Sequence, residues 1–303
     1  MDQRFYVGMD IGRSKIAVGL VSGEGRILRK KAVRTNLSNG GENIIRQSIS
    51  LIEGIIASTQ SRVFGIGICT IGIVDPKEGV IKDCSVSALT GVPIKRIIEG
   101  KFGLPTIVDN DLHCPAWGEY KFGASRGSKL AVYLTISSGA GISTIRNGMI
   151  DHGVHYLAGF IGNACILKNG SMLESAFSGT AIAERTGAAL GRKVTTEEAF
   201  RLARNKSNPA YKIIKNAEHY AACTVAAVQM SIDPDIIVLG GSVATNQAGF
   251  VANIKRPAEV MIGNGAVQMP NGINIRVSAL GKYNGVLGSA AMAMQKRQVE
   301  RRF

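Results

Sequence analysis

The sequence predicts an α/β protein made of two related domains that face each other across a central cleft. Each half of the chain contains two apolar strand patterns joined by a turn of small and polar residues, at residues 6–22 and 129–148. Helical patterns follow each pair of strands, and each half contains a further apolar strand pattern. An arrangement that occurs twice in one chain is typical of an internally duplicated α/β fold.

The first half begins with strand patterns over residues 6–12 and 15–22, and a third strand pattern over residues 26–35 follows a turn. Residues 41–59 predict a helix, because their isoleucines recur near helical spacing. These isoleucines are Ile44, Ile45, Ile49, Ile52, Ile55 and Ile56. The apolar run over residues 63–74 predicts a buried strand behind that helix.

The second half repeats this order with longer helices. After its strand pair, helical stretches are expected near residues 180–186, 196–204 and 209–230. The segment 234–244 then reads as a short apolar strand that a glycine pair stops.

The boundary between the domains is expected near residues 108–124, and a last helix from about residue 286 to residue 298 is expected to pack back on the first domain. The predicted small N-terminal domain is therefore residues 1–110 plus 286–303, and the predicted large C-terminal domain is residues 111–285.

The composition limits the class of protein. With 303 residues and 45% hydrophobic content, the chain can fill two cores. It has no apolar run of the roughly 20 residues that a membrane helix needs and no signal-peptide pattern, so a soluble cytoplasmic protein is expected. The formal net charge is +14, but the lysines and arginines are spread along the chain. That distribution favours a solvated basic surface over nucleic-acid binding. The positive electrostatic field of such a surface would also attract a nucleotide.

The cysteines and histidines show no metal-ligand spacing. No C-x-x-C pair occurs among Cys69, Cys84, Cys114, Cys165 and Cys223, so neither a disulfide framework nor a zinc site is recognisable. The four histidines, His113, His152, His155 and His219, are interpreted as surface or packing residues.

The turn "DIGRSK" in the first strand pair is a candidate phosphate site. Gly12 is able to take positive φ, while Ser14 and Lys15 offer donors to an anion. A hairpin turn that carries polar residues by chance explains this segment equally well.

A second turn, "TISSGAGIS", favours the phosphate interpretation. Ser137, Ser138 and Gly139 form a hydroxyl-rich loop with few side chains, which lets the backbone approach phosphate oxygens. The segment Gly240–Ser242 ends a strand where the backbone can lie against an adenine or a ribose. Each of these three segments is a weak signal by itself, but their order along the chain favours a nucleotide clamped between the two halves.

Between these loops, Asp109, Asn110 and Asp111 follow the apolar segment "PTIV". The carboxyl end of a strand is where α/β folds place catalytic groups. An aspartate there can take the proton from a substrate hydroxyl that attacks a phosphoryl group, and Asn110 can hold neighbouring hydroxyls. The alternative is that these residues only cap the next helix.

Taken together, the segments resemble the ROK family of sugar kinases. "DIGRSK" at residues 10–15 is similar to the family's "DIGGTK", and "DND" at residues 109–111 is similar to its "END". Three further segments match in order: "GIVDP" at 72–76, "SSGAGIS" at 137–143 and "LGG" at 239–241. The resemblance spans nearly all of residues 6–294 and implies two actin-like ATPase (ribonuclease H-like) domains.

The resemblance also implies an ATP- and Mg²⁺-dependent kinase, in the form of a homodimer, that phosphorylates the C6 hydroxyl of a sugar. Asp111 is then the catalytic base, and Asp10 holds Mg²⁺ through water. The implied sugar contacts are Gly72, Ser85, Asn110, Phe160, Asn163 and Glu174. The implied nucleotide contacts are Gly12, Ser14, Lys15, Ser137, Ser138, Gly139, Gly240, Gly241 and Ser242.

The chain departs from the family in its zinc loop. Many members carry a histidine and three cysteines where this chain reads "AGFIGNACILKNGSMLES" over residues 158–175. Asn163 stands at the histidine position, Met172 stands at the last cysteine position, and Cys165 has no partner at ligand spacing. The sequence therefore predicts a protein without zinc.

A second departure concerns the sugar. Phe160 replaces a glutamate that binds hydroxyl groups around C1 and C2 in similar enzymes. A ring cannot accept those hydrogen bonds, so glucose is disfavoured and an N-acetyl methyl group suits the wall better. Residues 109–127 also look like the N-acetylmannosamine kinase branch, which makes N-acetylmannosamine the favoured substrate. A glucokinase- or fructokinase-type hexose kinase is the alternative.

Two other classes belong to the same resemblance. The family includes sugar-responsive repressors with an N-terminal winged-helix domain, but here the phosphate turn begins within the first fifteen residues. A sugar-binding protein without catalysis is the other alternative, which the degenerate second loop favours and the intact Asp111 disfavours.

Overall fold

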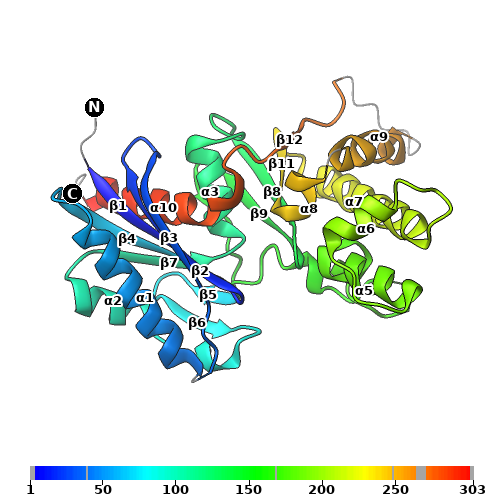
Figure 1. The fold of residues 1–303 in the computed structure, drawn as a ribbon. Helices are drawn as coiled ribbons and strands as arrows, with labels where there is room; N and C mark the ends of the chain where they lie inside the picture. Colours follow the sequence, from blue (N-terminus) through cyan, green and yellow to red (C-terminus); the bar gives the residue numbers. More distant parts are fainter. Residues whose placement is uncertain (1–3, 39, 168, 248, 264–270, 301–303) are drawn as a thin grey trace. The chain divides into compact units, whose positions relative to one another are not determined.

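A five-stranded mixed sheet forms the first part of the structure, with the strand order β3-β2-β1-β4-β7 (Figure 1). Its strands are β1 (Phe5–Ile11), β2 (Lys15–Ser22), β3 (Ile27–Arg34), β4 (Val63–Thr70) and β7 (Thr106–Asn110). β2 is antiparallel to both β1 and β3, whereas β4 is parallel to β1 and β7 is parallel to β4. The carboxyl ends of β1, β4 and β7 therefore lie at one edge of this sheet.

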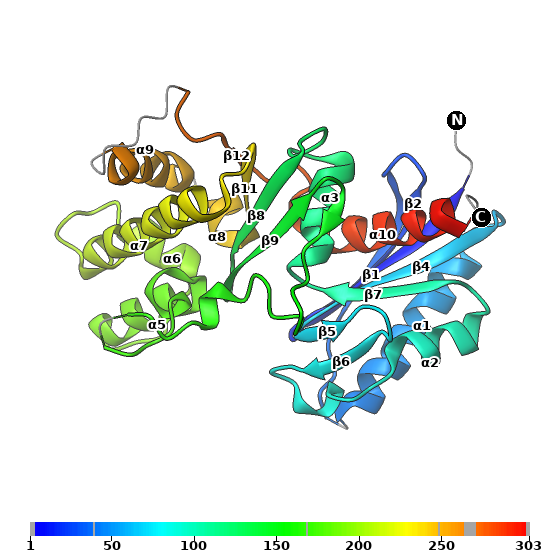
Figure 2. The same ribbon diagram turned by 180° about the vertical axis from the view of Figure 1, so that it is seen from behind.

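Helices cover both faces of this sheet (Figures 1 and 2). They are α1 (Gly40–Ala57), α2 (Ile94–Phe102), α3 (His113–Phe122) and α10 (Asn284–Glu300). Because successive side chains of a strand point to opposite faces, Val7 and Met9 pack in the core that α1 and α2 cover, whereas Tyr6 packs with α10. The smaller elements are β5 (Ile73–Asp75), β6 (Val80–Asp83), η1 (Ser87–Leu89) and η3 (Gly281–Tyr283).

Two strand glycines let α10 approach the sheet closely. A Cβ atom at Gly8 would fall on the carbonyl oxygen of Val286, and one at Gly67 would fall on that of Ser289. The hydroxyl of Ser289 donates to the carbonyl oxygen of Met9 at 3.2 Å. The prediction that the last helix packs on the first domain is therefore confirmed.

The second sheet repeats the plan of the first, in the order β10-β9-β8-β11-β12. Its strands are β8 (Leu130–Ile136), β9 (Ala140–Arg146), β10 (Met149–Ile150), β11 (Ile236–Gly240) and β12 (Ile275–Val277). Here too the first three strands form an antiparallel meander, and two later strands continue in parallel. The similarity of the two halves that the sequence predicted is confirmed in the sheet topology.

Six helices and a short 3₁₀ turn accompany the second sheet among the described residues. They are α4 (Glu174–Phe177), α5 (Gly179–Leu190), α6 (Thr196–Leu202), α7 (Pro209–Ile232), α8 (Gly241–Asn246), α9 (Phe250–Gly263) and η2 (Ile161–Asn163). Residues from α4 to α9 share one hydrophobic core with β8 and β11. The three helices predicted near residues 180–186, 196–204 and 209–230 correspond to α5, α6 and α7.

This computed structural model describes residues 4–38, 40–167, 169–247, 249–263 and 271–300. Its first compact unit is residues 1–126, 152–157 and 280–303, and its second is residues 127–151 and 158–279. The predicted division ends the first domain at residue 110, whereas the first unit continues through α3 because this helix packs on α10. No helix among the described residues combines the length and the apolarity that a membrane crossing requires.

Candidate functional site

The carboxyl edge of the first sheet gathers the acidic residues that the sequence singled out. Asp10 on β1 pairs with Cys69 on β4, and Cys69 pairs with Asp109 on β7, so these three residues form a row across parallel strands. Asn110 ends β7, and Asp111 follows it directly. The fold therefore brings Asp10, Asn110 and Asp111 to one edge of the sheet. This is the edge at which α/β proteins usually place their catalytic groups.

Asn110 starts the next helix with its side chain. Its Oδ1 atom accepts hydrogen bonds from the backbone amides of Leu112, at 3.1 Å, and of His113, at 2.8 Å. The N-cap residue of α3 is Leu112, and the side chain of Asn110, two residues before it, takes up the two backbone amides at the start of the helix. Because Asn110 is almost fully buried and its oxygen is engaged, the side-chain NH₂ group is what it can offer to a substrate.

Asp111 has the electrostatics of a base that works near neutral pH. Burial raises its pKa to about 7, the negative charge of Asp10 contributes to the rise, and the backbone amide of Asp111 itself opposes it. Asp111 is nevertheless exposed in part, so solvent reaches it at the edge of the sheet. A carboxylate that solvent reaches, with a pKa near the working pH, can accept a proton from a substrate hydroxyl.

Asp10 lies beside the first turn of α10. Burial raises its pKa, while the charge of Lys15 and a hydrogen bond with Cys69 lower it in part. A Cβ atom at Gly285 would lie 2.7 Å from Oδ2 of Asp10, so glycine there leaves room for the carboxylate. Mg²⁺ in proteins is commonly held by one or two carboxylates while it keeps several of its waters, so the Asp10 carboxylate is the type of ligand that this ion takes.

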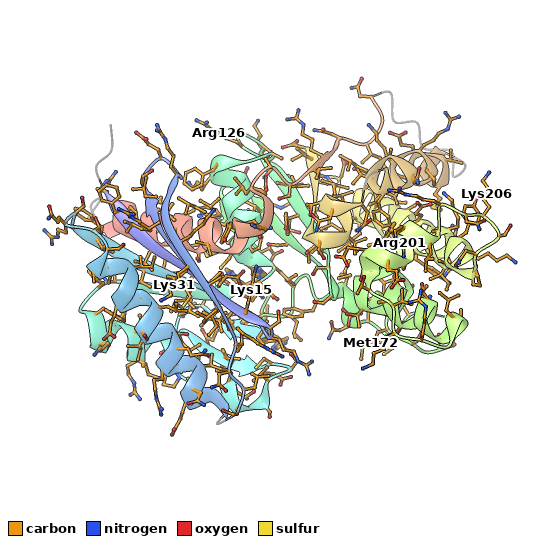
Figure 3. The ribbon with its side chains drawn as sticks, viewed as in Figure 1. Lys15, Lys31, Arg126, Met172, Arg201 and Lys206 are labelled. Carbon is orange, nitrogen blue, oxygen red and sulfur yellow. The ribbon has the colours of Figure 1, made fainter. Side chains whose placement is uncertain are left out.

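The turn between β1 and β2 is a closed hairpin. The amide of Gly12 donates to the carbonyl oxygen of Lys15 at 2.9 Å. The hydroxyl of Thr35, which directly follows β3, donates to the carbonyl oxygen of Gly12 at 2.7 Å. Gly12 was described as able to take positive φ, and the turn does not use this freedom, because the φ of Gly12 is not positive. Ser14 and Lys15 are exposed, so their side chains remain available to an anion (Figure 3).

A loop of the first unit, residues 152–157, is held by two polar contacts. Nε2 of His152 lies 2.8 Å from Oδ2 of Asp109. The hydroxyl of Tyr156 bonds the carboxylate of Asp75. Burial alone would raise the pKa of Asp75, but that bond, two backbone amides and the charge of Lys82 together lower it.

The His152 contact reaches the candidate catalytic residues. Oδ1 of Asp109 accepts a hydrogen bond from the backbone amide of Asn110 at 2.8 Å. The ring of His152 also stands edge-on to that of His113, with centroids 4.6 Å apart. The sequence interpretation of both histidines missed this cluster, because the residues are far apart along the chain and no spacing signals that they meet.

Gly72 and Ser85, the other sugar contacts implied for the first unit, lie close to each other. Gly72 has a φ of 98°, and a Cβ atom there would collide with Cys84, the neighbour of Ser85. Ser85 itself is exposed.

In the second unit, Glu174 holds the glycine loop between β8 and β9. Its Oε2 atom accepts a hydrogen bond from the amide of Ala140 at 3.1 Å and lies 2.7 Å from where a Cβ atom of Gly139 would stand. The carbonyl oxygen of Ser137 accepts a hydrogen bond from the amide of Gly179 at 2.6 Å. Glu174 was expected to bind the sugar, and one of its oxygens also positions the loop.

A cavity of about 960 Å³ opens beside this loop. Ser137, Ser138 and Ser242 line it, so three predicted nucleotide contacts meet at one cavity. The rest of its wall comes from α5, from the start of α6 and from residues 191–195. A volume of this size suits a nucleotide. Thr180, Lys193 and the other wall residues carried no sequence signal that would have found them.

The glycine pair after β11 has a packing role. Gly241 has a φ of 83°, and a Cβ atom there would collide with the backbone of Ile136. A Cβ atom at Gly240 would meet the ring of Tyr133. Both glycines therefore allow α8 to start against β8, which brings Ser242 to the cavity.

Phe160 and Asn163 flank η2, next to the glycine loop. Phe160 is partly buried, Asn163 is exposed, and the amide of Asn163 donates to the carbonyl oxygen of Phe160 at 3.1 Å. Between them, Gly162 packs against the carbonyl oxygen of Ala140. The second unit thus brings together Phe160, Asn163 and Glu174, the sugar contacts that the resemblance implied for it.

A model of the ROK family matches residues 6–296 of this chain. The glucokinase of Halalkalibacterium halodurans is 26% identical over 98% of this chain and 97% of its own length. The N-acetylmannosamine kinase of Yersinia pestis is 28% identical over 78% of this chain and 82% of its own length. The bifunctional enzyme NanE/NanK of Brucella melitensis is 31% identical over 95% of this chain, which spans 53% of that enzyme.

Solved structures similar to this chain include further ROK family enzymes. The ROK hexokinase from Thermus thermophilus has a TM-score of 0.85 and 29% identity, covering 97% of this chain and 99% of its own. A ROK family glucokinase from Streptomyces griseus, in complex with glucose and AMPPNP, has a TM-score of 0.79 and 24% identity, covering 96% of this chain and 99% of its own. These neighbours are ROK sugar kinases with the actin-like ATPase fold, so the predicted fold class is confirmed.

Proposed function

Because this chain belongs to the ROK family, we propose that it is an ATP- and Mg²⁺-dependent sugar kinase that phosphorylates the C6 hydroxyl of its substrate. The observation that carries the proposal is Asp111, an accessible carboxylate whose pKa is raised to about 7 at the carboxyl edge of the first sheet. Carboxylates with strongly raised pKa values cluster at catalytic sites, which favours an enzyme over a protein that only binds sugar.

The proposed reaction assigns one role to each group. Asp111 takes the proton as the O6–H bond breaks, and O6 forms a new bond to the γ-phosphorus. The bond from that phosphorus to the β–γ bridging oxygen breaks, and its electron pair leaves with ADP. Asn110 and Glu174 orient the sugar, the first through its side-chain NH₂ group.

The nucleotide is assigned to the cavity lined by Ser137, Ser138 and Ser242. The hydroxyl groups there can bind ribose or phosphate oxygens. In the first unit, the exposed Lys15 offers a cation to an anion. Bound Mg²⁺, held by Asp10 through water, would neutralise charge on the phosphates. A homodimer is expected from the family resemblance alone.

For the sugar, we favour an N-acetylhexosamine, with N-acetylmannosamine first and a hexose as the alternative. Phe160 supports this choice because its ring offers apolar contact and no hydrogen-bond acceptor beside the loop that Glu174 holds. Curated relatives at similar identity include both a glucokinase and an N-acetylmannosamine kinase. The choice between these substrates therefore depends on Phe160.

A coupled assay of ADP release over a panel of sugars tests the proposal. The wild-type protein should release ADP only with Mg²⁺ and a sugar acceptor. Asp111→Asn keeps the shape of the side chain and removes the base, so kcat should fall by about 10²–10⁴ while sugar binding remains. Sugar binding without ADP release in the wild type would favour the non-catalytic alternative. A variant as active as the wild type would disprove the role of Asp111.

A further inference from the structure

We propose that Asp109, His113 and His152 bind one Zn²⁺ ion in the first unit. The carboxylate and the two imidazoles each offer one ligand atom, and these atoms all lie within 4.8 Å of one another. This inference does not depend on the kinase proposal, because it concerns binding of the metal itself.

The three ligands come from parts of the unit that are already held in place. Asp109 ends β7, where its Oδ1 atom accepts from the amide of Asn110. His113 is the first residue of α3, and its amide is bonded by the side chain of Asn110. His152 lies in the loop that the Tyr156–Asp75 bond also fastens. Little conformational entropy would therefore be lost when a metal binds.

The ligand types select the class of metal. Two imidazoles and a carboxylate suit zinc and other transition metals, whereas Mg²⁺ prefers oxygen ligands and retains its waters. Three protein ligands would leave a fourth tetrahedral position for water. Among these metals, Zn²⁺ binds both imidazole nitrogen and carboxylate oxygen and has no redox chemistry, which favours it for this site.

The distances require only side-chain movement. Ligands about 2.0–2.1 Å from a tetrahedral zinc lie roughly 3.3 Å apart. Oδ2 of Asp109 and Nε2 of His152 are already 2.8 Å apart, sharing a proton that the metal would displace. Small rotations of the rings, which stand at 85° to each other, would bring in His113.

Burial strengthens the proposal. Asp109 and His113 are 3% and 1% exposed, and 25% of the His152 side chain is exposed. Buried charges in proteins are usually paired or bound to metals. The partial exposure of His152 leaves a route by which an ion enters.

This proposal departs from the prediction of a zinc-free protein. That prediction used spacing along the chain, whereas these ligands meet only in the fold. The site also differs from the zinc loop of the family, because the corresponding segment here, residues 158–175, belongs to the second unit and its Cys165 is exposed and free.

The experiment uses full-length protein without an affinity tag. The protein is stripped with a chelator, incubated with one equivalent of Zn²⁺, dialysed and analysed for metal by mass spectrometry. The wild type should retain about one zinc per chain, and His152→Asn should retain none. Excess zinc should raise the Tm of the wild type, on the order of 5 °C at 100 times Kd, and leave that of His152→Asn unchanged.

Matched variants locate the ion. His155→Asn alters an exposed histidine of the same loop, and Cys165→Ser alters the remnant of the family's zinc loop. Cys223→Ser removes a thiol that lies 3.7 Å from Nε2 of His219, the other metal-binding pair to consider. All three should retain zinc.

The Tm without metal shows whether each variant folds. If His152→Asn does not fold, His113→Asn provides a second ligand variant. Wild-type protein that retains no zinc would overturn the proposal and leave the cluster as a hydrogen-bonded pair with an edge-on ring contact. Zinc that stays bound in folded His152→Asn would overturn it as well.

Discussion

Burial raises the pKa of Asp111 to about 7, and the negative charge of Asp10 contributes to the rise. Both residues lie at the carboxyl edge of one sheet, Asp10 on β1 and Asp111 directly after β7. The same carboxylate that can hold Mg²⁺ therefore adjusts the proposed base. Metal bound at Asp10 would weaken the repulsion and lower the pKa of Asp111 in the substrate complex.

We expect a pH dependence that follows this base. Because Asp111 works only without its proton, kcat/KM should fall as pH drops through about 7, and it should level off above that pH. The inflection in kcat should lie lower, because bound Mg²⁺ favours the ionised base. Initial rates across the pH range measure both.

A variant separates the contribution of Asp10. In the free protein, Asp10→Asn should lower the pKa of Asp111, which a carboxyl NMR titration can follow without any activity. Asp83→Asn, at an exposed residue of β6, is the matched control and should leave that titration unchanged. A kcat/KM that does not vary between about pH 5 and pH 9 would contradict the assignment of Asp111 as base.

Glu174 is expected to act on both the loop and the sugar. Glu174→Gln can still accept the bond from the amide of Ala140, so it should raise KM for the sugar and leave KM for ATP nearly unchanged. Glu174→Ala loses that bond and should raise both constants, with about 1–3 kcal/mol of lost stability. Kinetics with each substrate varied in turn, and a denaturant titration, provide the measurements. Equal effects of the two variants on ATP would show that the loop does not depend on this hydrogen bond.

The space beside Asp10 gives a prediction at a glycine. In Gly285→Ala the new methyl group would stand 2.7 Å from Oδ2 of Asp10 and displace the carboxylate. KM for MgATP should rise by about tenfold, since small misplacements of a binding group are costly. Gly54→Ala is the control, because nothing lies within 4 Å of that position in α1. It should keep its kinetics and gain about 0.5–1 kcal/mol of stability. Unchanged KM in Gly285→Ala would argue against Asp10 as the metal residue.

Much of the fold could be predicted from periodicity. The isoleucines of α1 face one core, and the paired strand patterns became two sheets of the same order. These features depend on neighbours in sequence, which a single chain displays. The extent of the first unit was harder to predict, because α3 joins it through contacts with α10, a helix far away along the chain.

The position of Asp111 directly after a strand was predictable from the sequence, and its role as a base stays a prediction. The cluster of Asp109 with His113 and His152 was not predicted, since folding alone brings these side chains together. A glycine in the sequence does not show whether its conformational freedom is used. Gly12 does not take positive φ, whereas Gly241 does so for a packing reason.

The choice of sugar is the prediction that depends most on a single residue, Phe160. If its ring contacts an acetamido group, kcat/KM should be higher for N-acetylmannosamine, or failing that N-acetylglucosamine, than for glucose. The difference should be about ten- to hundredfold, because a buried unpaired hydroxyl or a lost methyl contact is worth that much. Phe160→Glu should reduce the preference by restoring a hydrogen-bond acceptor, and Phe160→Leu, which stays apolar, should largely keep it. A wild-type protein that prefers glucose, with the order of sugars unchanged in Phe160→Glu, would rule out this role and leave the kinase proposal intact.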